Sequence, residues 1–262
     1  MDLGLFGKTA IVLGASKGIG RACAGALAAE GCSLALAARD AKSLGDEAAA
    51  IAEKCHVRAF HRSCDVTRDA DRAVFLEDMV KQFERVDILV NNCEGPKVGT
   101  LKDLGDPKDW QDAIERSLLQ AVKWTQGVVP LMKGWGRIVN IVSTSVKQPI
   151  DGLLLSNTMR PGVIGFSKSI ARELASQGIT INSVLPGRIR TVRTADLARA
   201  RAEQEGMPIE SVLQERLRDI PAGRLGEPDE VGALVAFLCS QQAAYITGTT
   251  VTIDGGMTRT IL

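Results

Sequence analysis

The sequence lacks the features that would place it in or across a membrane. No window of about 18 residues is uninterrupted by polar side chains. The N-terminus, Met-Asp-Leu-Gly-Leu-Phe-Gly-Lys, has neither the basic region nor the apolar core of a signal peptide. We therefore expect a cytoplasmic protein that has no membrane partner.

An excess of charge of one sign is also lacking. The 32 Lys and Arg residues nearly balance the 31 Asp and Glu residues, and the formal net charge is +1. The basic residues form no concentrated stripe along the sequence. This pattern argues against nucleic acid as a partner.

The six cysteines include no Cys-x-x-Cys pair. Without an export signal, free buried thiols are expected in place of disulfides or a metal site. The composition, 45% hydrophobic and 24% charged, is ordinary for a globular protein. Because no linker or repeat interrupts the sequence, residues 1–262 are expected to form a single domain.

Short apolar runs alternate with helical patterns along the chain. The expected strands are Thr9–Leu13, Ser33–Ala38, Val57–Phe60, Val86–Val90, Arg137–Val142, Ile179–Leu185 and Thr249–Ile253. The expected helices are Arg21–Glu30, Ser43–Lys54, Asp69–Phe83, Asp109–Met132 with an end near Pro130, Met159–Ser176 and Asp229–Ser240. Because no hairpin signal separates the strands, the alternation predicts an α/β fold with a parallel sheet and right-handed crossovers. Residues 188–227 are arginine-rich and only weakly helical, and we expect them to cover a substrate pocket.

A glycine-rich turn joins the first strand to the first helix. It reads Gly14-Ala15-Ser16-Lys17-Gly18-Ile19-Gly20, a variant of the dinucleotide-binding fingerprint. Without Cβ atoms, the main-chain N–H groups and the helix N-terminus can approach a pyrophosphate closely. The alternative is a tight turn that binds no ligand.

Several ordered motifs together resemble the short-chain dehydrogenase/reductase family along essentially the whole chain. They are the glycine turn, Asp65-Val66, Asn91-Asn92-x-x-Gly95, a serine after the fifth strand, Pro186-Gly187-x-Ile189-x-Thr191, Tyr245-Ile246-Thr247-Gly248 and Asp254-Gly255-Gly256. The resemblance implies a doubly wound, Rossmann-type sheet of seven parallel strands with helices on both faces. It also implies a homo-oligomer, either a tetramer or a dimer.

The end of the second strand, Ala37-Ala38-Arg39-Asp40, bears on the choice of cofactor. An acid at this place binds the ribose 2′-hydroxyl of NAD, whereas an arginine accommodates the 2′-phosphate of NADP. The family's acid would fall at Ala38, so Arg39 and the nearby Lys17 favour NADP(H) over NAD(H). Asp40 remains an alternative, because a shift of one residue would present its carboxylate. With the contacts that the resemblance implies, the expected cofactor-binding residues are Gly14, Ser16, Lys17, Gly18, Ile19, Gly20, Arg39, Asp65, Val66, Asn91, Cys93, Pro186, Gly187, Ile189 and Thr191.

The catalytic positions depart from the family pattern, which has an asparagine, a serine and a Tyr-x-x-x-Lys pair. Ser143 matches the serine, but the asparagine, tyrosine and lysine positions hold Ser117, Ser156 and Arg160. The only tyrosine, Tyr245, lies far along the chain. Pro161 predicts either a kinked helix or a helix that begins near Met159, which would leave Ser156 in a loop.

The resemblance implies an NADP(H)-dependent carbonyl reductase or alcohol dehydrogenase, similar to 3-oxoacyl reductases. Its substrate would be a small-molecule carbonyl compound or alcohol. The altered positions leave two alternatives open: a catalytically impaired dinucleotide-binding module, and a non-redox enzyme on the same scaffold. Glu94 and Lys147 are candidate replacement acids, although each is more simply a surface charge, and Cys93 is interpreted as a packing residue.

Overall fold

One parallel sheet organises the computed structural model, which describes residues 2–261. Its strands are β1 (Thr9–Leu13), β2 (Ser33–Ala38), β3 (Ala59–Ser63), β4 (Ile88–Asn91), β5 (Gly136–Ile141), β6 (Ile179–Pro186) and β7 (Thr250–Ile253). The order across the sheet is β3-β2-β1-β4-β5-β6-β7, and all neighbours are parallel. The order reverses beside β1, so the carboxyl ends of β1 and β4 open the crevice in which such sheets bind ligands. The doubly wound, seven-stranded fold is confirmed.

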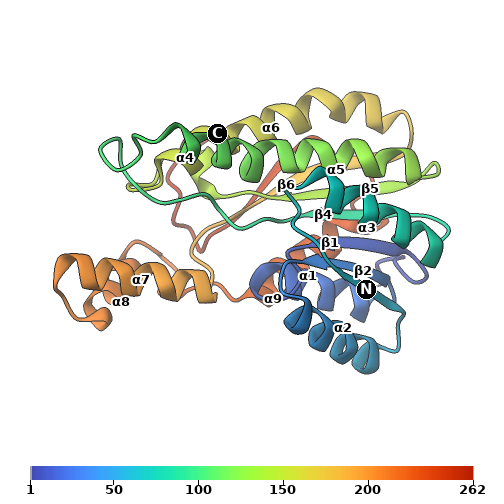
Figure 1. The fold of residues 1–262 in the computed structure, drawn as a ribbon, viewed down its shortest axis with the longest axis horizontal. Helices are drawn as coiled ribbons and strands as arrows, with labels where there is room; N and C mark the ends of the chain where they lie inside the picture. Colours follow the sequence, from blue (N-terminus) through green and yellow to red (C-terminus); the bar gives the residue numbers. More distant parts are fainter. Residues whose placement is uncertain (1, 262) are drawn as a thin grey trace.

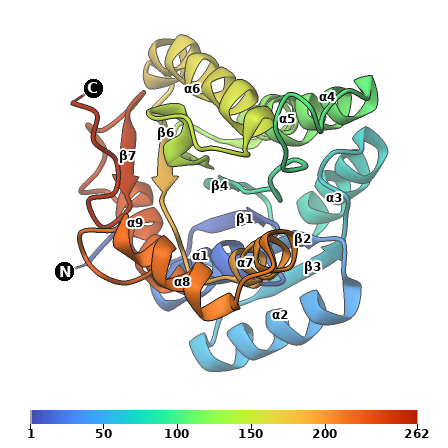
Figure 2. The same cartoon turned by 90° about the vertical axis from the view of Figure 1, so that its left-hand side faces the viewer.

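Helices cover both faces of this sheet (Figures 1 and 2). One face carries α1 (Gly18–Ala29), α2 (Ala41–Cys55) and α9 (Pro228–Cys239). The other carries α3 (Asp69–Gln82), α5 (Gln120–Val128) and α6 (Leu154–Ala175), and α4 (Pro107–Ile114) packs against α6. Successive residues of a strand point to opposite faces, and in β1 Ala10 and Val12 pack on the first layer while Ile11 and Leu13 pack on the second. A strand buried on both sides therefore has the continuous apolar sequence seen here.

The stretch expected as one helix over 109–132 is divided. A π-helical turn, Glu115–Leu119, separates α4 from α5, and a 3₁₀ turn, Val129–Leu131, follows α5. The expected end near Pro130 is confirmed, because regular helix stops at Val128. The π-helical turn contains Ser117, and such turns are frequent at functional sites.

The expectation that α6 begins near Met159 is wrong. The helix starts at Leu154, so Ser156 and Arg160 are both helical and lie one turn apart. The side chain of Asn157 anchors the first turn, since it accepts a hydrogen bond from the N–H of Ile150 at 3.1 Å and donates to its carbonyl at 2.9 Å. Pro161 lies inside the helix and removes one N–H donor. Its side chain is exposed, so water can reach that side of the helix.

Residues 188–227 form more helix than the sequence indicates. They contain α7 (Val192–Glu205) and α8 (Ile209–Arg218), which make a hairpin that projects from the body of the molecule (orange in Figure 1). Alanine and arginine, both frequent in α7, are strong helix formers. The hairpin has its own apolar cluster, to which Ala198, Ala202 and Val212 contribute buried side chains.

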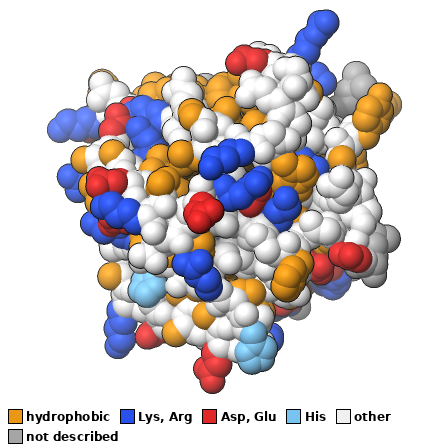
Figure 3. Space-filling model, turned by 90° about the vertical axis from the view of Figure 1, so that its right-hand side faces the viewer, with side chains coloured by type: hydrophobic (Ala, Val, Ile, Leu, Met, Phe, Trp, Pro, Cys, Tyr) orange, Lys and Arg blue, Asp and Glu red, His pale blue; other side chains and the backbone are white. Residues whose placement is uncertain are grey.

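The surface carries charges of both signs, as the balanced composition predicts. On the face drawn in Figure 3, acidic side chains lie among the basic ones, and neither sign occupies a large area alone. Within residues 2–261, no helix has the length and apolar character needed to cross a membrane. All six cysteines are free, and four of them are buried.

Candidate active site

The glycine turn has a geometry that only glycine tolerates. Gly14 and Gly18 have φ angles of +63° and +57°, in the left-handed region. A Cβ atom at Gly20 would lie 2.1 Å from the carbonyl oxygen of Gly14. Asn92, which follows the neighbouring strand β4, supports the turn, because its Nδ2 donates to the Leu13 carbonyl at 3.1 Å.

The same turn leaves the N-terminus of α1 open to a ligand. Lys17, the residue before the helix, makes no capping hydrogen bond with its side chain, and the first turn contains no acidic residue. The first N–H groups of a helix lack partners within it and attract anions. These observations fit a pyrophosphate, and the turn is therefore a suitable cradle for a dinucleotide.

A cleft of about 1240 Å³ lies in front of this turn, at the carboxyl ends of the strands. All but two of the expected cofactor-binding residues line it. The exceptions are Gly20, which packs behind the turn, and Asn91. The Asn91 side chain is buried and donates to Asn140 Oδ1 at 2.8 Å, while its neighbour Asn92 lines the cleft. The side chain of Asn91 therefore points away from the cleft, toward Asn140. The cleft-lining residues from the expected set are Gly14, Ser16, Lys17, Gly18, Ile19, Arg39, Asp65, Val66, Cys93, Pro186, Gly187, Ile189 and Thr191.

Arg39 and Asp40, at the end of β2, have different partners. Asp40 caps α2, because its Oδ1 accepts a hydrogen bond from the Ser43 N–H at 3.1 Å. Arg39 is exposed, and its Nη2 lies 2.6 Å from Glu94 Oε2. Lys17 also lines the cleft and has no carboxylate partner within residues 2–261. Asp40 also lines the cleft, so the cap alone does not decide between Arg39 and Asp40 as ribose or phosphate ligands.

Three of the four expected catalytic side chains line the cleft: Ser143, Ser156 and Arg160. Ser143 follows β5, and its Oγ accepts a hydrogen bond from the Ser145 N–H at 3.1 Å. Ser156 is buried, and its Oγ lies 3.4 Å from Ser145 Oγ. Ser145 is a residue that sequence reasoning missed, although the spacing Ser143-Thr-Ser145 after a strand was visible.

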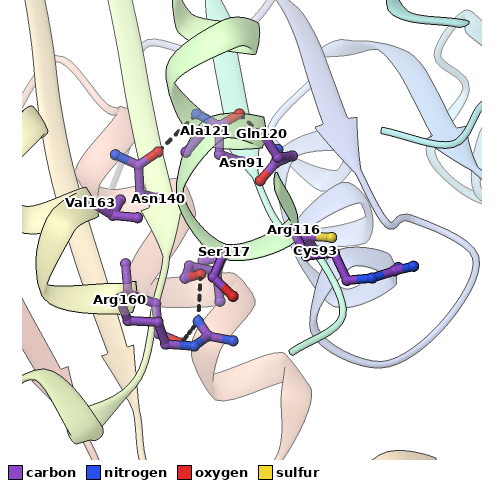
Figure 4. A pocket seen from close by; sticks show the side chains of 11 residues that line it. Asn91, Cys93, Arg116, Ser117, Gln120, Ala121, Asn140, Arg160 and Val163 are labelled. Atoms are coloured by element: carbon purple, nitrogen blue, oxygen red, sulfur yellow. Dashed lines mark hydrogen bonds between the residues drawn. The ribbon is translucent and has the colours of Figure 1, made fainter. Parts of the chain in front are cut away.

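The fourth expected residue, Ser117, lies in a small polar chamber beside the cleft (Figure 4). The chamber has a volume of about 20 Å³, which is close to the space of one water molecule. Arg160 lines both the chamber and the cleft. Ser117 Oγ and Arg160 Nε are buried and have no hydrogen-bond partner among the described residues. The structure thus brings Ser117 next to Arg160, away from the open cleft.

Arg160 is held by main-chain carbonyls. Its Nη1 donates to the carbonyls of Val142 and Ile141, the latter at 3.5 Å. Burial lowers the pKa of Arg160 to about 10, and the neighbouring Arg193 contributes in the same direction. The guanidinium therefore still carries its charge at neutral pH.

The remaining candidates have simpler roles. Burial raises the pKa of the Cys93 thiol, which keeps it protonated and fits its interpretation as a packing residue. Glu94 pairs with Arg39 and also lies 3.5 Å from Arg193 Nη1. Lys147 is not among the cleft-lining residues. Within the described chain, no cluster of His, Cys, Asp or Glu is arranged to hold a metal ion.

Known proteins similar to this chain cover almost its whole length. The family model described as enoyl-(acyl carrier protein) reductase matches residues 14–258. The 3-oxoacyl-[acyl-carrier-protein] reductase FabG of Escherichia coli (strain K12) is 39% identical over 253 residues, 96% of this chain and 97% of that protein. The D-beta-hydroxybutyrate dehydrogenase of Cupriavidus necator is 35% identical over 269 residues, 96% of this chain and 98% of that protein. The crystal structure of L-sorbose reductase from Gluconobacter frateurii, complexed with NADPH and L-sorbose, matches with a TM-score of 0.94 at 31% identity and covers 100% of both chains.

Proposed function

The chain belongs to the short-chain dehydrogenase/reductase family, and from that premise we propose that it is an NADP(H)-dependent oxidoreductase with a divergent active site. It interconverts a small-molecule carbonyl compound and the corresponding alcohol. One observation carries the proposal: Ser143, Ser156 and Arg160 line the same cleft as the glycine turn. Reacting groups and cofactor-binding groups therefore share one space.

The cofactor proposal rests on the glycine turn and on the end of β2. The glycine turn and the N-terminus of α1 would hold the pyrophosphate, while Lys17 and Arg39 would hold the 2′-phosphate. NADPH, when bound, supplies the hydride for carbonyl reduction. The NADPH complex of the Gluconobacter frateurii enzyme supports the choice of NADP(H). The first turn of α7, from Val192, also lines the cleft, which supports residues 188–227 as a substrate cover.

The serine hydroxyls would stabilise the negative charge that develops on the substrate oxygen. Because Ser143 Oγ accepts from the Ser145 N–H, its own O–H proton is free to point at the substrate. Ser156 can donate in the same way, and the charge of Arg160 stabilises the alkoxide further. A serine hydroxyl does not release its proton readily, so water supplies it. The chamber between Ser117 and Arg160 has the size and polarity to hold such a water.

A second function, a dinucleotide-binding module without redox chemistry, is favoured by two observations. The guanidinium of Arg160 is already engaged by the carbonyls of Val142 and Ile141, and no phenol is present in the tyrosine position. On this alternative, NADPH binds but is never oxidised.

The test is NADPH consumption with a panel of ketones and aldehydes, measured beside NADPH binding. Ser143→Ala is expected to lower turnover by about 100-fold or more, the usual effect of losing a donor to a developing oxyanion. Ser169→Ala is the matched control, because this exposed hydroxyl of α6 bonds to the Gly165 carbonyl outside the cleft. Tight NADPH binding with no turnover of any substrate would replace the oxidoreductase with the binding module.

A further inference from the structure

Six basic side chains line the cleft, and they differ in whether they have a counter-charge. Four of them pair with a carboxylate: Arg39 and Arg193 with Glu94, Lys97 with Asp109, and Arg116 with Asp112. Within residues 2–261, Lys17 and Arg160 have none. Lys17 is exposed at the glycine turn, where a phosphate is expected. Arg160 is therefore the one of these six side chains whose counter-charge comes neither from a described carboxylate nor from a proposed phosphate.

The unpaired charge of Arg160 is costly because the residue is half-buried and its Nε is shielded from water without a partner. Buried charges in proteins are ordinarily paired, since an isolated ion loses most of its hydration. Arg137 also has no carboxylate partner among the described residues, but it stacks on Trp135 at 4.2 Å, donates to main-chain carbonyls and does not line the cleft. Arg160 differs from Arg137, because its Nε is buried without a partner and its head group faces the cleft.

A second guanidinium faces the same place. A Cβ atom built on Gly95 would lie 3.3 Å from Arg160 Nη2 and 3.0 Å from Arg193 Nη2, so both groups border one small volume. Arg193 is not fully neutralised, because its 3.5 Å contact with Glu94 is long and Glu94 lies much closer to Arg39, at 2.6 Å. Two like charges this close repel each other, and an anion bound between them would offset that repulsion.

We propose that Arg160 and Arg193 bind a carboxylate carried by the substrate, which makes the substrate a small oxo acid or hydroxy acid. This assignment rests on the proposed oxidoreductase function, because it places the carboxylate in the cleft that Ser143 and Ser156 line. Guanidinium groups match a carboxylate in shape and form strong charge-assisted hydrogen bonds with it. The substrate anion then supplies the counter-charge that the protein lacks.

The direct test is a binding measurement that needs no turnover. Calorimetric titration of the NADP⁺-saturated protein would compare acetoacetate and levulinate with their uncharged methyl esters, and inorganic phosphate would form a third arm. We expect each acid to bind at least about ten-fold more tightly than its ester, because a hydrogen bond between charged groups contributes about that factor or more. Equal binding of acid and ester would overturn the proposal. Binding of phosphate without binding of the acids would also overturn it.

Three variants test whether Arg160 and Arg193 cause the preference for acid over ester. Arg160→Gln and Arg193→Gln should each bring the acid-to-ester ratio close to one. Gly95→Ala keeps both charges but inserts a methyl group against both guanidinium groups, and it should weaken acid binding alone. Lys97→Gln is the control, because Lys97 lines the same cleft but is paired with Asp109, and its ratio should stay unchanged.

Arg160→Gln also removes hydrogen bonds to the Val142 and Ile141 carbonyls, so its thermal unfolding must be measured alongside. If Arg160→Gln does not fold, the acid-to-ester binding ratios of Arg193→Gln and Gly95→Ala still test the proposal, because both substitutions lie in the cleft and not in the core. An unchanged ratio in these two variants would refute the site. Oxidation of NADPH by the neutral esters, with no preference for the acids, would refute the carboxylate site but support the oxidoreductase function. Acid-selective binding with no NADPH oxidation by any carbonyl compound would support the carboxylate site but refute the oxidoreductase function.

Discussion

The pairing of Arg39 with Glu94 makes a quantitative prediction about cofactor choice. Arg39 Nη2 lies 2.6 Å from Glu94 Oε2, and the two side chains are 57% and 51% exposed. An ion pair this exposed contributes about 0.2–1 kcal/mol. A 2′-phosphate that takes the Nη2 donor of Arg39 displaces Glu94, so the pair opposes NADPH binding by about that amount at most. Glu94→Gln should therefore tighten NADPH binding by up to about five-fold.

Removing the arginine has the opposite and larger effect. A hydrogen bond to a charged group contributes about 1.5–3 kcal/mol, so Arg39→Gln should weaken NADPH binding by about 10- to 140-fold. NADH has no 2′-phosphate, and its affinity should change little in either variant. Because the groups are exposed, raising the ionic strength should shrink both effects.

Fluorescence titration with NADPH and NADH, at low and high salt, measures these changes. Arg190→Gln is the matched control, because Arg190 is an exposed arginine paired with Glu227 at 2.8 Å and does not line the cleft. The reasoning is refuted if Arg39→Gln changes the two affinities equally. It is also refuted if Glu94→Gln weakens NADPH binding.

Three further predictions concern the turn, the cap and the charge of Arg160. Gly20→Ala should lower the free energy of unfolding by about 1–3 kcal/mol or more, because its Cβ would clash with the Gly14 carbonyl. Gly25→Ala, in the same helix, has open space around its Cβ and should raise the free energy of unfolding by up to about 1 kcal/mol. Thermal unfolding measures both changes. Equal effects would contradict this geometry. Asp40→Ala should cost about 1 kcal/mol of unfolding free energy through the lost cap of α2 and leave NADH affinity unchanged, and a loss of NADH affinity would restore Asp40 as a ribose ligand. Because the pKa of Arg160 is lowered to about 10, turnover that needs its charge should be level around neutral pH and fall as pH rises through about 10; a decline that starts near neutrality would point to another group.

Most strands could be predicted closely, including β7 at one edge of the sheet, but β3 at the other edge could not, for a physical reason. β1 and β2 are almost fully buried and have largely apolar sequences that identify them. β3 lies at an edge of the sheet, and its polar residues His61 and Arg62 are exposed. Its observed bounds therefore lie two to three residues beyond those of the expected strand, Val57–Phe60. An exposed strand carries little hydrophobic signal.

The candidate site could likewise be predicted only in part. Motif spacing was enough to predict the glycine turn and to predict that Ser143, Ser156 and Arg160 share one site, and all three line the cleft. The start of α6 depended on how Asn157 pairs with Ile150, which a proline rule does not include. The approach of Arg193 to Arg160 depends on where α7 is placed, and no local pattern records that placement.

The α7–α8 hairpin has a consequence for how such a protein can diversify. Because its apolar cluster is its own, changes within the hairpin need not disturb the cluster beneath the sheet. Yet the first turn of α7 supplies Val192, Arg193 and Thr194 to the cleft. Exchange of this one segment between related proteins could therefore transfer substrate preference while the nucleotide-binding half stays as it is.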